Sequence, residues 1–149
     1  DYLLDTCVVI DLVRGNQEII NQLKSKSPGN IYISTITEFE LRFGLVQKPS
    51  LNKEAKKLSV ISVKGKYSTF QVEESQIAAN LRYGLKLKGT PIGAYDILIA
   101  ATALTNDFIL VTSNEKEFNR IEELQIENGG EKQLISIIMS SKRELANDM

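Results

Sequence analysis

The sequence contains no histidine among its 149 residues. This absence excludes Ser-His-Asp and Cys-His catalytic sites, and it excludes zinc sites built on imidazole. Any proton transfer or charge stabilisation by this protein must therefore depend on carboxylates, lysine, tyrosine or a bound cation.

Cysteine occurs once, as Cys7. A single cysteine excludes an internal disulfide and a cage of thiolate ligands, and it fits the reducing cytoplasm that we expect for this protein. Because Cys7 opens the apolar run Cys-Val-Val-Ile, we interpret it as a buried packing residue. No apolar run approaches the length of a membrane span, so we expect no membrane association. With 42% hydrophobic and 25% charged residues, the composition is typical of one globular domain.

The charged residues are unevenly distributed along the chain. Residues 41–90 contain ten Lys or Arg and three acidic residues, a net charge of +7, whereas the remainder carries −8. A basic middle beside an acidic remainder suits a protein that binds phosphates with one surface and cations with another. An ordinary solvated helix face would explain the pattern equally well.

Strand and helix patterns alternate along the chain. We predict strands at 2–4, 31–34, 69–72, 108–111 and 124–126, and helices at 6–14, 17–26, 52–63, 73–88, 94–105 and 114–118. A further helix is predicted after residue 34, capped by Thr35 or Thr37, with Phe39, Leu41, Phe43 and Leu45 on its inner face. This alternation predicts an α/β sandwich around a mostly parallel sheet.

Four acidic residues lie where strands give way to helices or loops. They are Asp5, Glu40, Asp96 and Glu117. Because ligands collect at the carboxyl ends of parallel strands, these carboxylates could converge on one hard divalent cation, Mg²⁺ or Mn²⁺. Asp5 could instead cap the next helix, and Asp96 could favour a helix dipole. The turn formed by Gly89, Pro91 and Gly93 nevertheless suggests a backbone built to aim Asp96.

Two of the four positions have competing candidates. Glu38 and Glu40 point in different directions on a helix; we favour Glu40, because Gly44 one turn later would let another element approach. For the fourth position we favour Glu117 over Asn114, although the Asn114 carbonyl could also bind a metal. The sequence has no Gly-x-x-x-x-Gly-Lys phosphate loop, no Gly-x-Gly-x-x-Gly and no Cys-x-x-Cys.

Four segments of the sequence match known motifs: Leu-Leu-Asp-Thr-Cys-Val-Val-Ile-Asp-Leu-Val-Arg-Gly (3–15), Ile-Ser-Thr-Ile-Thr-Glu-Phe-Glu-Leu-Arg-Phe-Gly (33–44), Gly-Thr-Pro-Ile-Gly-Ala-Tyr-Asp-Ile-Leu-Ile-Ala-Ala (89–101) and Leu-Val-Thr-Ser-Asn-Glu-Lys-Glu-Phe (110–118). Together they resemble the PIN-domain ribonucleases and, among them, the VapC toxins, in the family's order and spacing. The resemblance covers about residues 2–127. Many relatives have Asn at the position of Cys7, and many have Asp at the position of Asn114.

The resemblance implies a PIN-like three-layer sandwich over residues 1–128 and an added segment, predicted helical, over 129–149. It implies the toxin of a type II toxin–antitoxin pair, acting as a Mg²⁺-dependent endoribonuclease with Mn²⁺ as a substitute. The metal ligands and catalytic residues would be Asp5, Glu40, Asp96 and Glu117, with Asn114 as a further ligand. The implied partners are an RNA substrate, for which a transfer RNA is a candidate, a VapB-type antitoxin and a second copy of the chain.

Two other functions compete with the nuclease. In a non-catalytic binding module on the same fold, the acids would only cap helices, and the dimer would serve a partner protein. In a receiver-type phosphoryl-transfer domain, an aspartate after a middle strand and a late lysine would be required, and neither has a convincing context. Loss of a manganese site in Asp96→Asn would separate the nuclease from the binding module.

Overall fold

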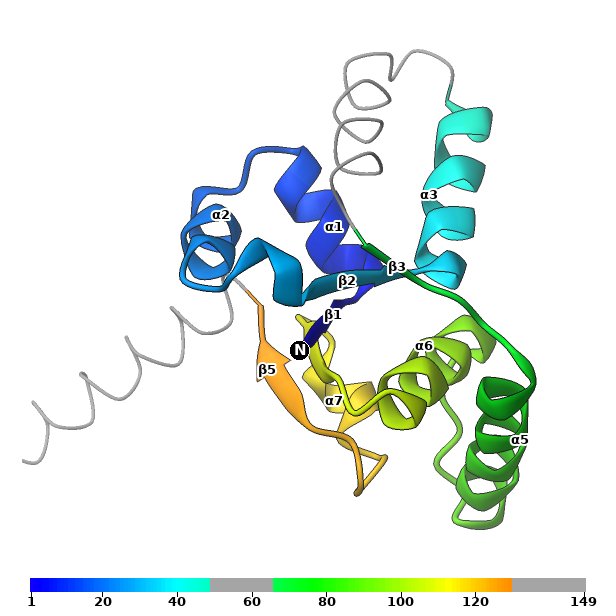
Figure 1. Ribbon diagram of the computed structural model, residues 1–149. Helices are drawn as coiled ribbons and strands as arrows, with labels where there is room; N and C mark the ends of the chain where they lie inside the picture. The colour runs from blue at the N-terminus through cyan, green and yellow to red at the C-terminus, as the bar shows by residue number, and fades with distance from the viewer. Residues whose placement is uncertain (49–65, 130–149) are drawn as a thin grey trace, which may run out of the picture.

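The structure is a computed structural model that describes residues 1–48 and 66–129. Its elements are, in chain order, β1 (Tyr2–Leu4), α1 (Thr6–Val13), α2 (Gln17–Lys24), η1 (Pro28–Asn30), β2 (Ile31–Ser34), α3 (Thr35–Gln47), β3 (Lys66–Ser68), α5 (Val72–Leu87), α6 (Ala94–Thr105), β4 (Ile109–Thr112), α7 (Glu115–Phe118) and β5 (Ile126–Asn128) (Figure 1).

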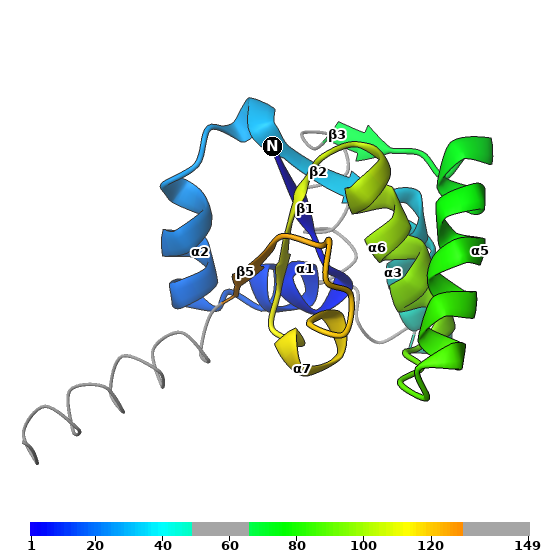
Figure 2. The ribbon, with the colours of Figure 1, turned by 90° about the horizontal axis from the view of Figure 1, so that it is seen from below.

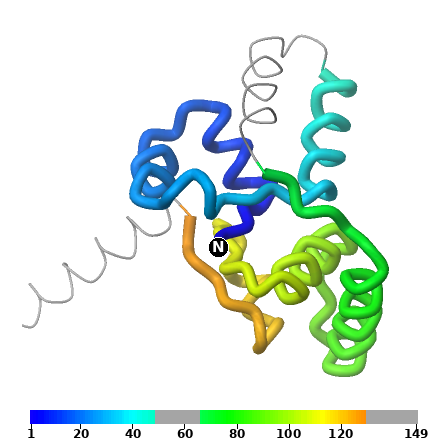
Figure 3. Tube along the Cα trace, in the orientation of Figure 1, coloured from blue at the N-terminus to red at the C-terminus, as the bar shows by residue number. Residues whose placement is uncertain are grey.

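The five strands form one parallel sheet in the order β3-β2-β1-β4-β5. The first strand is therefore the central one, and the chain starts at the amino end of the middle strand of the sheet (Figure 3). In the register, Leu4 lies between Ile33 of β2 and Val111 of β4. Because all strands run the same way, their carboxyl ends share one edge of the sheet.

Alternate residues of the strands pack into two separate hydrophobic cores, one on each face of the sheet. Leu3 and Leu110 pack with α5 and α6 on one face, whereas Leu4, Ile33 and Val111 pack with α1 and α2 on the other. Figure 2 shows the sheet between these two helical layers. The near-continuous apolar strands are those expected of a sheet that is covered on both faces. The predicted three-layer α/β sandwich is confirmed.

Polar residues directly before the helices stabilise the helix starts. The side chains of Asp5, Asn16 and Ser34 each accept hydrogen bonds from backbone N–H groups in the first turn of the next helix, which stabilises the start of that helix. Helix α5 begins with a capping box between Gln71 and Glu74. Gly15 adopts a φ of +81° just after α1, a conformation that favours glycine at helix ends.

Several sequence predictions were wrong in detail. The cap of α3 is Ser34 rather than Thr35 or Thr37. Phe39 and Phe43 are half-exposed, because a helix repeats every 3.6 residues and only the line through Thr37, Leu41 and Leu45 faces inward.

The strand predicted at 69–72 is instead β3 at Lys66–Ser68, and β4 and β5 start one and two residues later than predicted. The helix predicted at 52–63 and the segment 130–149 lie outside the described residues. Among the helices of the described ranges, none has the length and apolar character needed to cross a membrane.

Candidate active site

The four acids selected from the sequence surround the carboxyl edge of the three central strands. Asp5 directly follows β1, and Glu117 lies in α7, just beyond the end of β4. Glu40 lies in the second turn of α3, the helix that leaves β2, and Asp96 lies in the first turn of α6.

Asp5 is held from two sides. It is 4% exposed. Its Oδ1 accepts a hydrogen bond from the Thr6 N–H at 2.8 Å, and its Oδ2 accepts one from the Thr112 hydroxyl at 2.7 Å. The Cys7 thiol also donates to Oδ2, at 3.2 Å. Asp5 is thus a helix cap, as one reading of the sequence held, while its second oxygen is fixed at the end of β4.

A chain of hydroxyl groups fixes Glu40. The Thr6 hydroxyl donates to Glu40 Oε1 at 2.9 Å, and it lies 3.0 Å from the Thr37 hydroxyl. The Ser34 hydroxyl in turn donates to Thr37 at 3.2 Å. Because each hydroxyl has a single hydrogen, the direction is set: Ser34 donates to Thr37, Thr37 to Thr6, and Thr6 to Glu40. Ser34 and Thr37 are fully buried, so the chain links Glu40 to the core.

The competing acid on this helix is engaged elsewhere. Glu38 accepts from Arg42 at 2.6 Å and from the Tyr67 hydroxyl at 3.0 Å. The preference for Glu40 therefore agrees with the geometry. The reason given from the sequence was wrong, however, because a Cβ at Gly44 would meet nothing within 4 Å, and no other described element approaches there.

Backbone shape explains the position of Asp96. Gly93 is the residue before α6, and a Cβ at this position would lie 3.3 Å from Asp96 Oδ2. A side chain there would crowd the carboxylate, so glycine allows it to fold back over the helix start.

Asn114 contacts the fourth acid. Its Nδ2 donates to Glu117 Oε2 at 3.2 Å, and its backbone N–H donates to the Thr112 hydroxyl at 2.9 Å. Thr112 therefore connects Asn114 to Asp5. In this arrangement Asn114 orients a neighbouring acid with its amide nitrogen and leaves only its carbonyl oxygen for other contacts.

The electrostatics show that the four acids act on one another. The pKa of Asp96 is raised from 3.8 to about 7; burial is the largest cause, and the charge of Asp5 is the second. A hydrogen bond with Glu117, and the charges of Glu117 and Glu40, act in the same direction. The pKa of Glu40 is also raised, first by burial and then by Asp5, while the Thr6 hydroxyl opposes the rise. Burial and the Asp5 charge raise the pKa of the Cys7 thiol, which stays protonated.

No basic side chain of the described residues balances this charge. The ion pairs recorded there join Lys26 to Glu127, Arg42 to Glu38 and Lys88 to Glu122. Within residues 1–48 and 66–129, no three histidine, cysteine, aspartate or glutamate side chains stand close enough to hold a metal ion as they are. Charges act over longer distances than coordination bonds, so this finding agrees with the raised pKa values. The donor set, four carboxylates without a counter-charge, fits a hard cation that draws them together.

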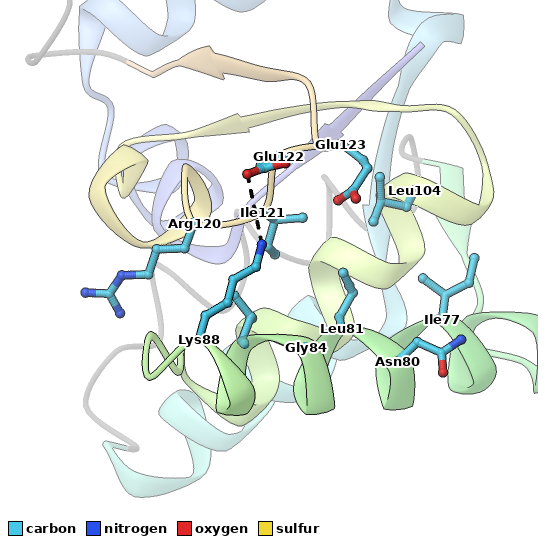
Figure 4. A pocket seen from close by; sticks show the side chains of 11 residues that line it. Ile77, Asn80, Leu81, Gly84, Lys88, Leu104, Arg120, Ile121, Glu122 and Glu123 are labelled. Atoms are coloured by element: carbon cyan, nitrogen blue, oxygen red, sulfur yellow. Dashed lines mark ion pairs between the residues drawn. The ribbon is translucent and has the colours of Figure 1, made fainter.

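Two cavities within the described residues lie away from the four acids. A cavity of about 340 Å³ lies between α5 and the segment after α7, lined by Leu81, Gly84, Lys88, Ile121 and their neighbours (Figure 4). A more polar cavity of about 490 Å³ lies near Tyr32, Glu74 and Asn106. Neither of these two cavities is lined by any of the four acids.

Sequence reasoning missed the hydroxyl groups of this site. Thr6, Thr37 and Thr112 each contact an acid or a residue that contacts one. The available signal was that threonine begins the helix α1 at position 6 and ends the strand β4 at position 112. Their partners, however, lie 34 and 107 residues away along the chain, which no local pattern reveals.

Comparison with known families gives a match over most of the chain. The model of the PIN domain family matches residues 2–124. A protein of Rickettsia felis named ribonuclease VapC1 is 35% identical over 127 residues, which cover 83% of this chain and 92% of that protein. The tRNA(fMet)-specific endonuclease VapC of Salmonella typhimurium is 33% identical over 132 residues, covering 85% of this chain and 96% of that protein.

Solved structures give the same result. The structure of VapBC2 from Rickettsia felis bound to a promoter DNA fragment matches with a TM-score of 0.79 at 30% identity, over 86% of this chain and 98% of that one. DNA-bound VapBC from Salmonella typhimurium matches with a TM-score of 0.76 at 26% identity, over 86% and 97%.

Proposed function

Because the chain belongs to the PIN-domain family and, within it, to the VapC ribonucleases, we propose that it is the toxin of a type II toxin–antitoxin pair. It is an endoribonuclease that cleaves phosphodiester bonds of RNA with the help of Mg²⁺, for which Mn²⁺ can substitute. A transfer RNA is the first candidate substrate, since relatives in Salmonella typhimurium and Shigella flexneri are named tRNA(fMet)-specific endonucleases.

The observation that carries the metal-dependent mechanism is the placement of four acids around the carboxyl edge of the sheet, where burial and the other three acids raise the pKa of Asp96 to about 7. Such perturbed carboxylates mark functional sites. Asp5, Glu40, Asp96 and Glu117 would hold the cation, and Asn114 would orient Glu117. A bound divalent ion supplies positive charge at the phosphate and promotes attack by water. Histidine is not needed for this chemistry, which suits its absence from the chain.

The residues around the ligands prepare the site. Thr112 fixes the orientation of Asp5, and the hydroxyls of Ser34, Thr37 and Thr6 fix Glu40. Asp96 must release its proton before its carboxylate can serve as a ligand. The missing side chain of Gly93 leaves the space that this carboxylate occupies. The protein would thus supply four oxygen donors, two of them already fixed by hydroxyl groups, and a bound cation would offset the repulsion between their charges.

Cleavage of purified transfer RNA and of total cellular RNA tests this proposal. We expect cleavage in Mg²⁺, none in excess EDTA, and none with Asp5→Asn or Asp96→Asn. Asp107→Asn is the matched control for Asp96→Asn, because Asp107 is exposed beyond the other end of α6. Glu115→Gln is the control for Glu117→Gln, because both acids lie in α7. Wild-type cleavage by Asp96→Asn would leave the non-catalytic binding module as the better account.

The proposed partner is a VapB-type antitoxin, since the matched structures include VapBC complexes with DNA. A small gene next to that of this chain, encoding a DNA-binding protein, is the expected genomic arrangement. Co-expression should give a complex in which the cleavage of RNA is inhibited. The homodimer stays a prediction, which sedimentation of the purified chain at several concentrations would check.

A further inference from the structure

An arginine joins the two segments that carry Asp96 and Glu117. Asp96 follows the turn between α5 and α6, and Glu117 lies in α7. Arg120, just after α7, donates a hydrogen bond from Nη1 to the backbone carbonyl of Pro91 in that turn, at 2.6 Å. Hydrogen bonds with a charged donor are among the stronger ones in proteins. We call this contact the Arg120 bridge.

Both ends of the bridge are anchored in the protein. On the side of α7, the Arg120 N–H donates to the Glu117 carbonyl at 3.1 Å, and the next residue, Ile121, is buried. On the side of the turn, Ile92 follows Pro91 and is also buried. Ile92 and Ile121 pack in the same hydrophobic core. The Arg120 side chain therefore connects two backbone segments that are each fixed from the inside.

The same two segments meet a second time at the acids. The side chains of Asp96 and Glu117 are hydrogen-bonded to each other. This contact needs a proton, because two charged carboxylates repel. The Arg120 bridge does not depend on that proton. It can therefore hold the segments at their distance when Asp96 loses its proton and its carboxylate becomes available to a cation.

Two other roles for Arg120 have less support in the structure. An arginine near acids could be their counter-charge, but the ion pairs recorded in residues 1–48 and 66–129 do not include Arg120. An arginine that binds an RNA phosphate would offer its donors to solvent, whereas Arg120 uses one on a backbone carbonyl. Pro91 lies outside the helices and strands, so its carbonyl needs such a partner.

We propose that Arg120 is a positioning residue of the cation site: by holding the Pro91 carbonyl, it sets the separation of Asp96 and Glu117. This inference deepens the proposed metal-dependent ribonuclease function and rests on it. Arg120 acts through the backbone and contacts neither the cation nor the RNA. Replacing a residue that orients metal ligands commonly lowers metal affinity by about 10–100-fold.

The direction of the change in Mg²⁺ affinity separates positioning from a simple effect of charge. Arg120→Met removes a positive charge from the segment that carries Glu117, and by Coulomb's law this loss alone should strengthen the binding of Mg²⁺. Loss of positioning should weaken it. Lys88→Met is the matched control, because Lys88 is an exposed cation that pairs at 4.0 Å with Glu122, beyond α7 (Figure 4). Arg120→Lys keeps the charge and a donor.

Two measurements on the full chain test the proposal. Calorimetric titration with Mg²⁺ gives the affinity, and hydrogen exchange in EDTA reports on residues 89–93 and 115–120 without any cation. We expect Arg120→Met to bind Mg²⁺ about tenfold more weakly and to exchange faster in these two segments, with β1 and β4 unchanged. Arg120→Lys should lie closer to the unchanged protein in both measurements. Lys88→Met should bind Mg²⁺ at least as tightly as the unchanged protein.

RNA cleavage adds a readout that separates cation binding from substrate binding. Arg120→Met should need about tenfold more Mg²⁺ for half of its maximal rate, while its KM for RNA at saturating Mg²⁺ stays unchanged. A higher KM for RNA together with an unchanged Mg²⁺ affinity would assign Arg120 to the substrate, and the proposal would be wrong.

The binding experiments decide the proposal independently of cleavage. Mg²⁺ binding by Arg120→Met that equals or exceeds that of the unchanged protein overturns it, and so does equal weakening by Lys88→Met. If the unchanged protein binds Mg²⁺ and Arg120→Met weakens that binding, but no RNA is cut, the ribonuclease function fails and the positioning role stands.

Discussion

Replacing Asp96 with asparagine should stabilise the metal-free protein and abolish its activity. Asn has nearly the shape of a protonated Asp, and its amide can donate to Glu117 as the protonated carboxyl does. The variant cannot carry the negative charge that burial and three neighbouring acids oppose. Activity and stability are therefore expected to change in opposite directions.

The size of the expected gain in the free energy of unfolding follows from the pKa of Asp96. The rise from 3.8 to about 7 is about three units, and each unit corresponds to about 1.4 kcal/mol. The upper limit is thus about 4 kcal/mol. Since the Asp96 side chain is only partly buried, solvent screening reduces the expected gain to about 2 kcal/mol.

The raised pKa of Asp96 also sets the direction in which stability changes with pH. Between about pH 4 and pH 7 the folded protein binds a proton at Asp96 that the unfolded chain releases. Stability contributed by this group therefore falls as the pH rises through that window. Asp96→Asn should match the wild type at pH 4 and exceed it increasingly up to about pH 7, with a constant difference above.

Urea denaturation in EDTA at a series of pH values measures this difference. Asp107→Asn should follow the wild type throughout, because Asp107 is exposed. Adding Mg²⁺ should stabilise the wild type by about 1.4 kcal/mol at ten times the dissociation constant and should stabilise Asp96→Asn much less. A variant that is less stable than the wild type at pH 8 in EDTA would refute the reasoning.

Three further predictions concern the residues that position the acids. Gly93→Ala should displace the Asp96 carboxylate by a few tenths of an ångström, since its Cβ would lie 3.3 Å from Oδ2, and weaken Mg²⁺ binding about tenfold in calorimetry. Gly84→Ala in α5 meets open space and should only raise stability by about 0.5–1 kcal/mol. Thr112→Val removes a buried hydrogen bond of 2.7 Å to Asp5 and should cost about 2 kcal/mol in urea denaturation; an unchanged midpoint would contradict that role. Thr6→Val removes the hydroxyl that lowers the pKa of Glu40, so the midpoint pH for Mg²⁺ binding should rise; a fall would show that Thr6 does not stabilise the Glu40 carboxylate.

The elements that the sequence predicted best have strong local signals. The bounds of α6 were predicted to the residue, because a mostly apolar segment of twelve residues follows a turn with proline and two glycines. β1 and β2 were likewise correct, since each is a run of β-forming residues that ends in a polar helix cap. In these segments the local pattern and the tertiary environment favour the same structure.

The errors occurred where two local signals competed. Thr69, Phe70 and Val72 favour a strand, but Gln71 and Glu74 form the capping box that starts α5 one residue after Gln71. In α3, the aromatic residues at 39 and 43 suggested an inner face that helical geometry does not provide. Their exposure is evidence about function rather than packing, because exposed aromatic groups mark interaction sites.

Two of the four acids of the candidate site are fixed by hydrogen bonds, and the other two are subject to electrostatic repulsion. Asp5 and Glu40 accept hydrogen bonds from threonine hydroxyls, and these belong to a network that includes buried residues. Neither acid can therefore move without breaking hydrogen bonds. Asp96 and Glu117 lie in the helices α6 and α7, and Glu117 is one of the causes that raise the pKa of Asp96, so a bound cation would displace the proton of Asp96. The unfavourable electrostatic free energy is therefore concentrated on Asp96, whose pKa is raised to about 7. Since the hydroxyls hold the first two ligands before any cation binds, the binding energy of the ion needs to reorganise only the second pair. That division predicts that Thr112→Val reduces stability with or without Mg²⁺, whereas Asp96→Asn raises stability without Mg²⁺ and loses most of the stabilisation that Mg²⁺ adds to the wild type.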